Sequence, residues 1–466
     1  MKELLRWFVP DAGIFAELTL HGNTKWLPTP LVCLALCWAW AEAKHVTDAF
    51  DTAVEQCRLL GMISLGTYQG FMNALATWTD PLLRRLWPVL HQRMEQIGGS
   101  FWRVGKWVPI AFDGSRSTVP RTQSAEQAFC APNYGGGETA KYRKKKSKGM
   151  RRRRNEKNKP QPQAPQTWIT LLWHMGLRLP WSWRLGPSNS SEREHVLEML
   201  NEGGFRKHTL FCGDAGFVGY PLWSAIIARG HHFLVRVGAN VELLTKMNCV
   251  RQKGGPVLSW PGAARQSHQP PLALRLVHVK VGKTWMWMLT SVLDSRRLNH
   301  HQIIKLYAMR WGIEIEFRGL KQTLDRAKLR CRNDRRLLAE LNWSILAMAV
   351  VELFALREQL PPPTRATTQT AAAIPIGDPQ RRSLAGAMRA LRYCLNHLES
   401  APQAHRNLRW QLRQAVTDDY VRKSAKRSRY RRPNPDKKPL GHPNVRRLTP
   451  REIIQLNACE SRKTAA

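Results

Sequence analysis

Short apolar segments alternate with turns and helical segments between residues 107 and 237, and this rhythm constrains the fold more than any other feature of the chain. Apolar runs of strand length predict five strands, at Trp107–Phe112, Thr167–Trp173, Leu177–Leu185, Thr209–Cys212 and His232–Val237. Helices are predicted between the last three of these strands, at Ser191–Leu200 and Pro221–Arg229. Strands followed by strand–helix–strand units favour an α/β fold, in which helices flank a mixed sheet.

The rest of the chain is organised around this core, which takes up residues 101–237 and contains a basic loop at 138–166. Residues 1–100 have apolar residues at helical spacing, which predicts a helical region that either binds DNA or caps the core. Residues 238–292 have Gly and Pro turns between short alternating segments, which predict a β-rich insertion. Two long helices within 293–360 are expected to complete the core, and 361–466 to form a helical region with a basic tail.

The charge of the chain indicates the kind of partner that it binds. Lys and Arg outnumber Asp and Glu by 73 to 34, which gives a formal net charge of +39. A balance this basic points to nucleic acid or to an anionic membrane. The segments Lys141–Lys157 and Arg422–Arg447 are so rich in like charge that we expect disorder and contact with nucleic-acid backbone. A solubility or localisation tail is the alternative.

The apolar segments and the cysteines indicate in which cellular compartment the protein is expected. The most apolar stretch, Trp26–Ala41, is short and contains two prolines, so we expect a buried core helix and no membrane span. No signal peptide is evident, and the nine Cys lack the spacing of a metal site. A cytoplasmic protein with free thiols is expected.

One run of polar residues has the spacing of a helix face. A helix turns about 100° per residue, which places Tyr307, Arg310, Glu314 and Lys321 within an arc of roughly 60°. Glu316 points elsewhere. A lone carboxylate flanked by cations suits a metal ion bound beside a phosphodiester. The alternative is an ordinary surface helix, whose mixed charges pair weakly at i, i+3 and i+4.

Two aspartates follow predicted strands, and we expect them to form one site together with this helix face. Asp113 ends the strand at 107–112 and Asp214 ends the strand at 209–212, each with a glycine beside it. Alone, either could be a turn residue or a helix N-cap. With Glu314 they supply three hard oxygen ligands, which suits two Mg²⁺ ions about 3.5–4 Å apart, with Mn²⁺ as a substitute. One ion would activate the attacking oxygen and the other would stabilise the leaving one.

The order Asp, Asp, Glu and the Tyr-x2-Arg-x3-Glu-x6-Lys helix resemble the DDE transposases of bacterial insertion sequences, in particular the insertion-sequence-four family, over roughly residues 105–355. The resemblance implies a ribonuclease-H-like core interrupted by a β-rich insertion, with Asp113, Asp214 and Glu314 as metal ligands. It implies phosphate contacts near the cleaved transposon end for the other signature residues, Tyr307, Arg310 and Lys321. Some family members hold a flipped base against a Trp of the insertion, and Trp285 and Trp287 lie there; both could equally be core residues.

The resemblance also implies what the chain does. We expect a DNA transposase that cleaves transposon ends with the help of a divalent metal and transfers the strand into target DNA. The expected partners are transposon-end and target DNA, on which the chain would act as a homodimer, associated with the bacterial nucleoid. The alternatives are a catalytically silent DNA-binding protein derived from such an enzyme and a structure-specific DNA nuclease.

Overall fold

A computed structural model describes residues 1–9, 12–18, 25–62, 66–130, 165–246, 254–282, 284–360, 377–399, 407–417 and 440–464. The basic loop predicted at 138–166 lies outside the described residues except for its last two positions. Most of the basic segment Arg422–Arg447 also lies outside them. Of the described residues 440–447, the last four form a strand, so the prediction of disorder is wrong for residues 444–447.

Ten described strands form one sheet. Their bounds are β1 Val108–Thr118, β2 Gln166–His174, β3 Leu179–Gly186, β4 Thr209–Gly213, β5 His232–Val237, β6 Glu242–Thr245, β7 Gly254–Ser259, β8 Leu272–Val281, β9 Thr284–Thr290 and β10 Asn444–Arg447. The order across the sheet is β10-β6-β7-β8-β9-β5-β4-β1-β2-β3. Within the half from β5 to β3, β2 alone runs antiparallel to its neighbours. This mixed half-sheet with its flanking helices confirms the predicted α/β class.

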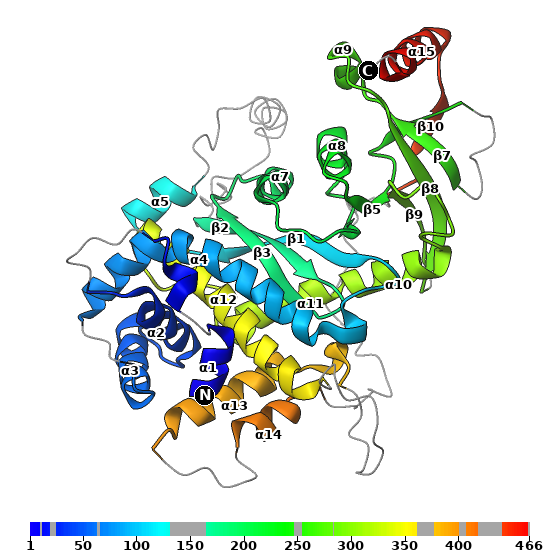
Figure 1. The fold of residues 1–466 in the computed structure, drawn as a ribbon. Coiled ribbons are helices and arrows are strands. Elements are labelled where there is room, and N and C mark those ends of the chain that lie inside the picture. Colours follow the sequence, from blue (N-terminus) through cyan, green and yellow to red (C-terminus); the bar gives the residue numbers. More distant parts are fainter. Residues whose placement is uncertain are drawn as a thin grey trace, which may run out of the picture.

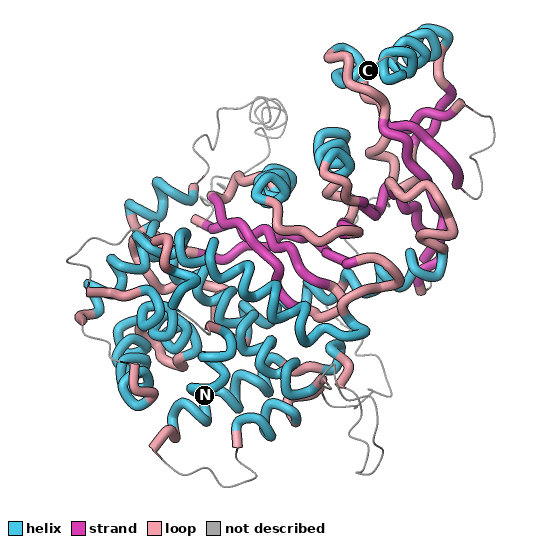
Figure 2. The backbone as a smooth tube through the Cα atoms, in the orientation of Figure 1, coloured by secondary structure: helices cyan, strands magenta, loops and turns pink. Residues whose placement is uncertain are grey.

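Helices cover both faces of that half-sheet. Their bounds are α1 Lys2–Phe8, α2 Pro28–Trp40, α3 Val46–Leu59, α4 Tyr68–Gly98, α5 Gln123–Phe129, α7 Glu192–Glu202, α8 Tyr220–Ala228, α9 Gly262–Gln266, α10 His300–Arg310, α11 Gly312–Gln322, α12 Asp334–Gln359, α13 Leu384–Asn396, α14 Leu408–Arg413 and α15 Pro450–Thr464, with short 3-10 turns at Ala12–Phe15, Gly99–Phe101 and Pro379–Arg381. Figure 1 shows α7 and α8 on one face and α11 and α12 on the other. The N-terminal helices gather on the α12 side, away from the insertion (Figure 2).

Helix α12 is the centre of the helical layer. It packs against α2, α4, α13 and α14 and against strand β3. It is also the one described helix that is long and apolar enough to cross a membrane, but 94% of its most apolar window is buried inside the protein. Its apolar surface is therefore covered by the other helices and the sheet, which is the pattern of a core helix.

The C-terminal segment returns to the insertion, which the sequence did not predict. Strand β10 pairs in parallel with β6 and extends the sheet at its outer edge. Glu452 of α15 accepts hydrogen bonds from Arg446 of β10, with Arg446 Nη2 at 2.8 Å, and also pairs with Arg265 of α9. These charge-assisted contacts attach α15 to the insertion.

Two elements near Asp113 and Glu314 differ from the sequence prediction. Strand β1 does not end at Asp113 but continues to Thr118, because its last residues pair with β2 in an antiparallel ladder. The single helix predicted across residues 307–321 is divided into α10 and α11 at Trp311. Trp311 keeps right-handed helical dihedrals, so the predicted helical spacing survives the break.

Candidate active site

Two neighbouring parallel strands place Asp113 and Asp214 at the same edge of the sheet. The ladder between β1 and β4 ends where Ala111 pairs with Cys212. Asp113 and Asp214 each follow two residues later, so the register sets them opposite one another. Asp214 begins a tight turn, in which its Oδ1 accepts a hydrogen bond from the Gly216 amide at 2.7 Å. The structure therefore brings the two aspartates together, as the sequence predicted, although Asp113 lies within its strand.

Glu314 joins them from α11, which packs against β1. The guanidinium of Arg310 lies between the acids, with Nη1 3.7 Å from Asp113 Oδ2 and Nη2 4.0 Å from Glu314 Oε1. The side chain of Glu314 is 45% exposed, whereas that of Asp113 is 19% exposed. The helix face that carries Arg310 and Glu314 therefore lies beside Asp113, as the sequence predicted.

Arg310 is the least satisfied polar side chain of the site. It is 4% exposed, and its Nε and Nη1 make no hydrogen bond with any described residue. Its guanidinium lies between two aromatic rings, 5.4 Å from the centroid of Tyr307 and 5.3 Å from that of Trp311. A buried donor without an acceptor is costly, so these nitrogens indicate an anionic ligand.

The other two residues of the signature take different positions. Tyr307 is only 2% exposed, so its ring is packed in the core beneath Arg310 and does not offer a surface to DNA. Lys321 Nζ donates to Ser115 Oγ of β1 at 2.7 Å, and partial burial lowers the pKa of Lys321. Ser115 lies two residues after Asp113, on the same face of β1. Lys321 is therefore held beside the acids.

A fourth acid, Glu192, lies at this site, and sequence reasoning missed it. Burial, together with the charges of Asp113 and Asp214, raises the pKa of Glu192 to about 7. Burial likewise raises the pKa of Asp113 to about 6, against the effect of the Gly114 amide and of Arg310, which lower it. An acid in the first turn of a helix is commonplace because the helix dipole favours it, so no sequence signal singles out Glu192.

Glu316 points away from the site, as predicted, but it is not a neutral surface residue. It is 4% exposed and accepts a hydrogen bond from Trp173 Nε1 at 3.3 Å. Burial and the neighbouring Glu352 raise the pKa of Glu316 well above its usual value. Arg382 then pairs with Glu352 at 2.8 Å. This buried network fixes α11 to α12.

The two tryptophans of the insertion have different environments. Both stack on His278, with ring centroids 4.8 Å away for Trp285 and 4.3 Å away for Trp287. Trp285 is 58% exposed, whereas Trp287 is 8% exposed and donates to His442 Nδ1 at 2.8 Å. Trp287 is therefore part of the packing between β9 and the C-terminal segment. Only Trp285 presents an open ring face.

The acids suit a hard divalent cation by their chemistry, since carboxylate oxygens are the ligands that Mg²⁺ and Mn²⁺ prefer. Within the described ranges, however, no three side chains of His, Cys, Asp or Glu lie close enough together to hold a metal ion. Arg310 accounts for this spacing, because its guanidinium occupies the position between Asp113 and Glu314. The carboxylates therefore fit a divalent cation by their chemistry, while in this structure Asp113 and Glu314 are held apart by the guanidinium of Arg310.

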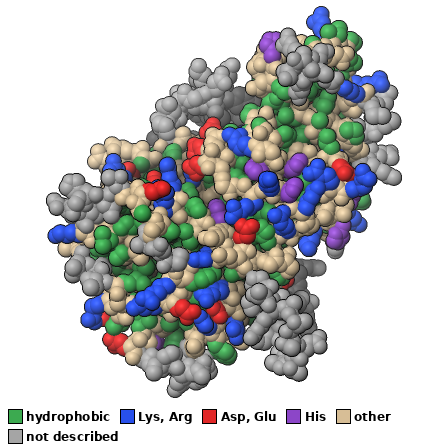
Figure 3. All heavy atoms as spheres, viewed as in Figure 1, with side chains coloured by type: hydrophobic (Ala, Val, Ile, Leu, Met, Phe, Trp, Pro, Cys, Tyr) green, Lys and Arg blue, Asp and Glu red, His purple; other side chains and the backbone are tan. Residues whose placement is uncertain are grey.

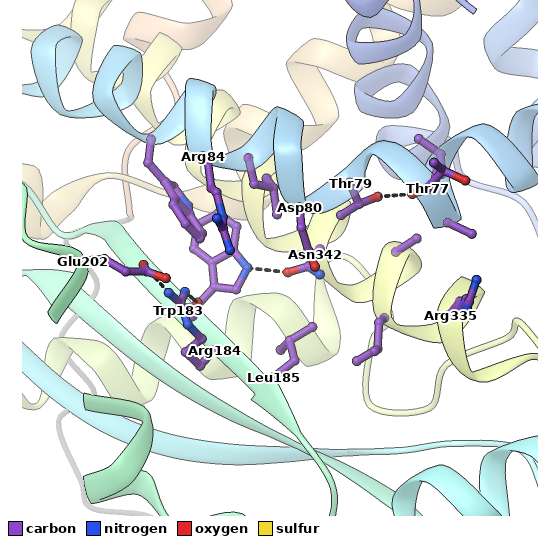
Figure 4. Close-up of a pocket in the computed structure, with 16 residues that line it drawn as sticks. Thr77, Thr79, Asp80, Arg84, Trp183, Arg184, Leu185, Glu202, Arg335 and Asn342 are labelled. Atoms are coloured by element: carbon purple, nitrogen blue, oxygen red, sulfur yellow. Dashed lines mark hydrogen bonds and ion pairs between the residues drawn. The ribbon is translucent and has the colours of Figure 1, made fainter. Parts of the chain in front are cut away.

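The described structure also has hollows away from the acidic site. A cavity of about 380 Å³ opens between α4, β3 and α12, where Trp183 Nε1 donates to Asn342 at 2.7 Å (Figure 4). None of the predicted site residues lines it. A second hollow of about 610 Å³ is lined by Lys44, Arg330, Arg332 and Arg336, and by no acid from the described part of the chain. Figure 3 shows further Lys, Arg and His side chains gathered over β8, β9 and α10.

The chain is similar to one protein family and to two known transposases. The family described as "Transposase DDE domain" matches residues 108–350, just over half of the chain. Transposase InsG for insertion sequence element IS4 of Escherichia coli (strain K12) is 28% identical over 172 residues, which cover 34% of this chain and 37% of that protein. The similarity thus spans little more than a third of this relative. A cryo-EM structure of the piggyBac transposase synaptic complex with hairpin DNA aligns over 91% of this chain and 86% of that chain, with 12% identity and a TM-score of 0.40.

The family match begins at the first residue of β1 and ends inside α12. It therefore includes both aspartates, Glu314 and the helix face that carries Arg310. By this match the chain belongs to the transposase DDE-domain family.

Proposed function

We propose that this protein is a DNA transposase that cleaves transposon ends in a metal-dependent reaction and transfers the strand to target DNA. The observation that carries the proposal is the arrangement of Asp113, Arg310 and Glu314 beside Asp214, at the end of the β1–β4 ladder. The three carboxylates can bind a divalent metal, and the buried guanidinium of Arg310, two of whose nitrogens lack hydrogen bonds within the described structure, can bind a phosphate. A metal-dependent reaction of a phosphodiester needs both.

Each side chain has a role that follows from its position. Asp113, Asp214 and Glu314 bind two Mg²⁺ ions, or Mn²⁺ as a substitute. A divalent cation held there would activate the attacking oxygen and stabilise the charge on the leaving one. Arg310 transfers its unsatisfied nitrogens from the acids to a phosphate, and Lys321 neutralises a second phosphate oxygen. Tyr307 supports Arg310 from below.

The charge of the protein suits a DNA partner. We propose that transposon-end and target DNA lie across the basic surfaces, and that the chain acts on them as a homodimer in the bacterial nucleoid. The open face of Trp285 would stack on a base, since every base offers a π-face and such stacking is worth about 1–3 kcal/mol. Trp287, being buried, would only hold His278 and the C-terminal segment in place.

Two other functions share parts of this site. A catalytically silent DNA-binding protein would keep the basic surfaces but would not cleave. A structure-specific nuclease would cleave but would not join the 3′-OH to a second duplex. A strand-transfer assay with labelled end DNA and a supercoiled target plasmid separates all three: the transposase gives joined products, the nuclease gives cut but unjoined DNA, and the silent protein leaves the DNA uncut.

Arg310 variants test whether the helix face holds a phosphate. Arg310→Ala is expected to lower cleavage of end DNA by about 10²–10³-fold, as for the loss of one preorganised donor to a developing charge. Arg310→Lys should stay impaired, because a point charge cannot replace the planar fork. Mn²⁺ binding, measured by calorimetry without DNA, should be retained in both variants. Arg318→Ala, an exposed cation on α11, is the matched control; normal cleavage by Arg310→Ala would refute the assignment.

The basic hollow beside α3 is a candidate surface for the DNA backbone. Lys44 and Arg332 are exposed at its rim. The double variant Lys44→Ala/Arg332→Ala is expected to reduce the log–log salt dependence of DNA binding by about 0.9 for each phosphate that is no longer neutralised, for all sequences alike. Fluorescence anisotropy at several salt concentrations measures this slope. Lys207→Ala, at the opposite edge of the sheet from the acids, should leave it unchanged; equal slopes for both variants would exclude this hollow.

A further inference from the structure

Glu192 occupies an unusual place for a charged side chain. It is the first residue of α7 and follows the N-cap Ser191, whose side chain accepts a hydrogen bond from the Glu194 amide. Helix α7 packs against β1, β2 and β3. The cap fixes where the helix begins, and the helix start in turn fixes Glu192 over the middle of β1.

Gly114 provides the space that Glu192 fills. A Cβ atom at Gly114 would lie only 2.0 Å from Glu192 Oε1 and 2.6 Å from Glu192 Cδ, so no other residue fits there without displacing the glutamate. The dihedrals of Gly114 do not require glycine, since its φ is not among the positive values of the chain. Its amide meanwhile donates to Asp113 Oδ1 at 2.8 Å. The backbone of Gly114 thus lies between two carboxylates.

Ordinary roles for a first-turn glutamate do not explain this placement. No described cation lies within ion-pair distance of Glu192, although Arg116 and Arg193 are near enough to lower its pKa. Arg193 instead donates to the Val218 carbonyl at 2.9 Å, and Arg116 lies over the ring of Trp168 at 4.2 Å. An interaction with the helix dipole needs no burial and is equally open to Glu194 of the same turn, which is exposed.

The site already holds a second sign that ligands are to be expected. Arg310, 4% exposed, has two nitrogens without hydrogen bonds within the described structure, and they lie beside Asp113. Glu192 lies against Gly114, the residue next to Asp113, and the same site holds the buried guanidinium of Arg310 and the ammonium of Lys321. Helix α7, which carries Glu192, and helix α11, which carries Glu314, lie on opposite faces of the sheet (Figure 1).

We propose that Glu192 is a fourth carboxylate of the active site, which binds the divalent cation together with Asp113 and Asp214, and that Gly114 is glycine to admit it. The inference rests on the proposed function, because it adds a ligand to the same metal site. Glu192 comes from the opposite side of the sheet to Glu314. It would therefore give the cation a ligand that is not paired with Arg310.

Mn²⁺ binding to the whole chain, titrated by calorimetry in the absence of DNA, tests the proposal without reference to activity. Glu192→Gln keeps the shape of the side chain and is expected to weaken Mn²⁺ binding by about 10–100-fold. Gly114→Ala, which keeps every charge but displaces Glu192, should weaken it in the same direction. Glu194→Gln, which removes a charge from the same helical turn, should bind like the native protein. Thermal unfolding of each variant establishes that it is folded.

The outcomes separate this inference from the proposed function. Asp214→Asn serves as the reference, because it removes a ligand that the proposed function requires. If Asp214→Asn loses Mn²⁺ binding while Glu192→Gln retains native affinity, Glu192 is not a ligand and the inference alone fails. If neither variant changes Mn²⁺ binding, the metal site itself fails. If Glu192→Gln and Glu194→Gln weakened Mn²⁺ binding equally, the total negative charge at the start of α7, and not Glu192 itself, would determine the affinity. That result also refutes the inference.

Discussion

Asp113→Asn, Asp214→Asn and Glu314→Gln are each expected to lower metal-dependent strand cleavage by roughly 10³-fold or more, while leaving DNA binding intact. Each change removes one anionic ligand at the end of the β1–β4 ladder, and the loss should exceed the roughly 10²–10³-fold cost of a single electrostatic donor. DNA binding should be unchanged or slightly tighter, since less negative charge then faces the phosphates. Cleavage of a labelled duplex in Mg²⁺ and a gel-shift titration measure the two properties.

Glu194→Gln is the matched control for these variants, because Glu194 is an exposed acid in the first turn of α7. It should cleave at the native rate. Near-native cleavage by any one of the three acid variants would remove that residue from the metal site. Loss of DNA binding together with cleavage would instead indicate that the variant had disturbed the fold of the sheet edge.

The double variant Glu316→Gln/Glu352→Gln is expected to lower the free energy of unfolding by about 3–5 kcal/mol, because it leaves a buried Arg382 without a carboxylate. The side chain of Arg382 is 3% exposed and that of Glu352 is 4% exposed. Arg382 also donates to the Leu177 carbonyl at 2.8 Å, so it cannot easily turn to solvent. Urea unfolding followed by tryptophan fluorescence measures the change.

Arg184 provides a matched control for that network, since it also faces two glutamates, Glu198 and Glu202, but with their side chains 59% and 44% exposed. Glu198→Gln/Glu202→Gln should cost at most about 1 kcal/mol for each pair. Equal effects of the two double variants would mean that Arg382 is not held as a buried charge. The same network shows that Glu316→Ala cannot serve as an inert reference for Glu314, because Glu316 anchors α11.

Sequence reasoning succeeded where a local pattern determines the structure. The strands that lead to Asp113 and Asp214 were predicted with nearly the right first residues, because apolar periodicity acts over short distances. The helix face of Arg310 and Glu314 was also predicted, since helical spacing places both residues on one side whatever they contact. Asp113 was misplaced at a strand end because Asp-Gly resembles a turn, whereas pairing with β2 continues the strand.

What the sequence could not supply depends on contacts between distant segments. Gly114 owes its identity to Glu192, which lies beyond two intervening strands. The burial of Tyr307 and of Trp287 depends on packing that periodicity does not reveal. The basic composition of β10 gave no sign of a strand. A strand at the edge of a sheet tolerates charged side chains and needs only one partner strand, here β6.

The central claim is that this chain performs metal-dependent cleavage of a DNA end, and the most direct measurement uses the DNA that flanks its own reading frame. The purified chain would be incubated with duplexes from each boundary of that element, in Mg²⁺ or in EDTA, and the strands resolved on a sequencing gel. We predict a cut that exposes a 3′-OH at the element boundary in Mg²⁺, and none in EDTA or with Asp214→Asn. Specific binding of the same ends by the native chain without any cleavage in Mg²⁺ or Mn²⁺ would contradict the claim.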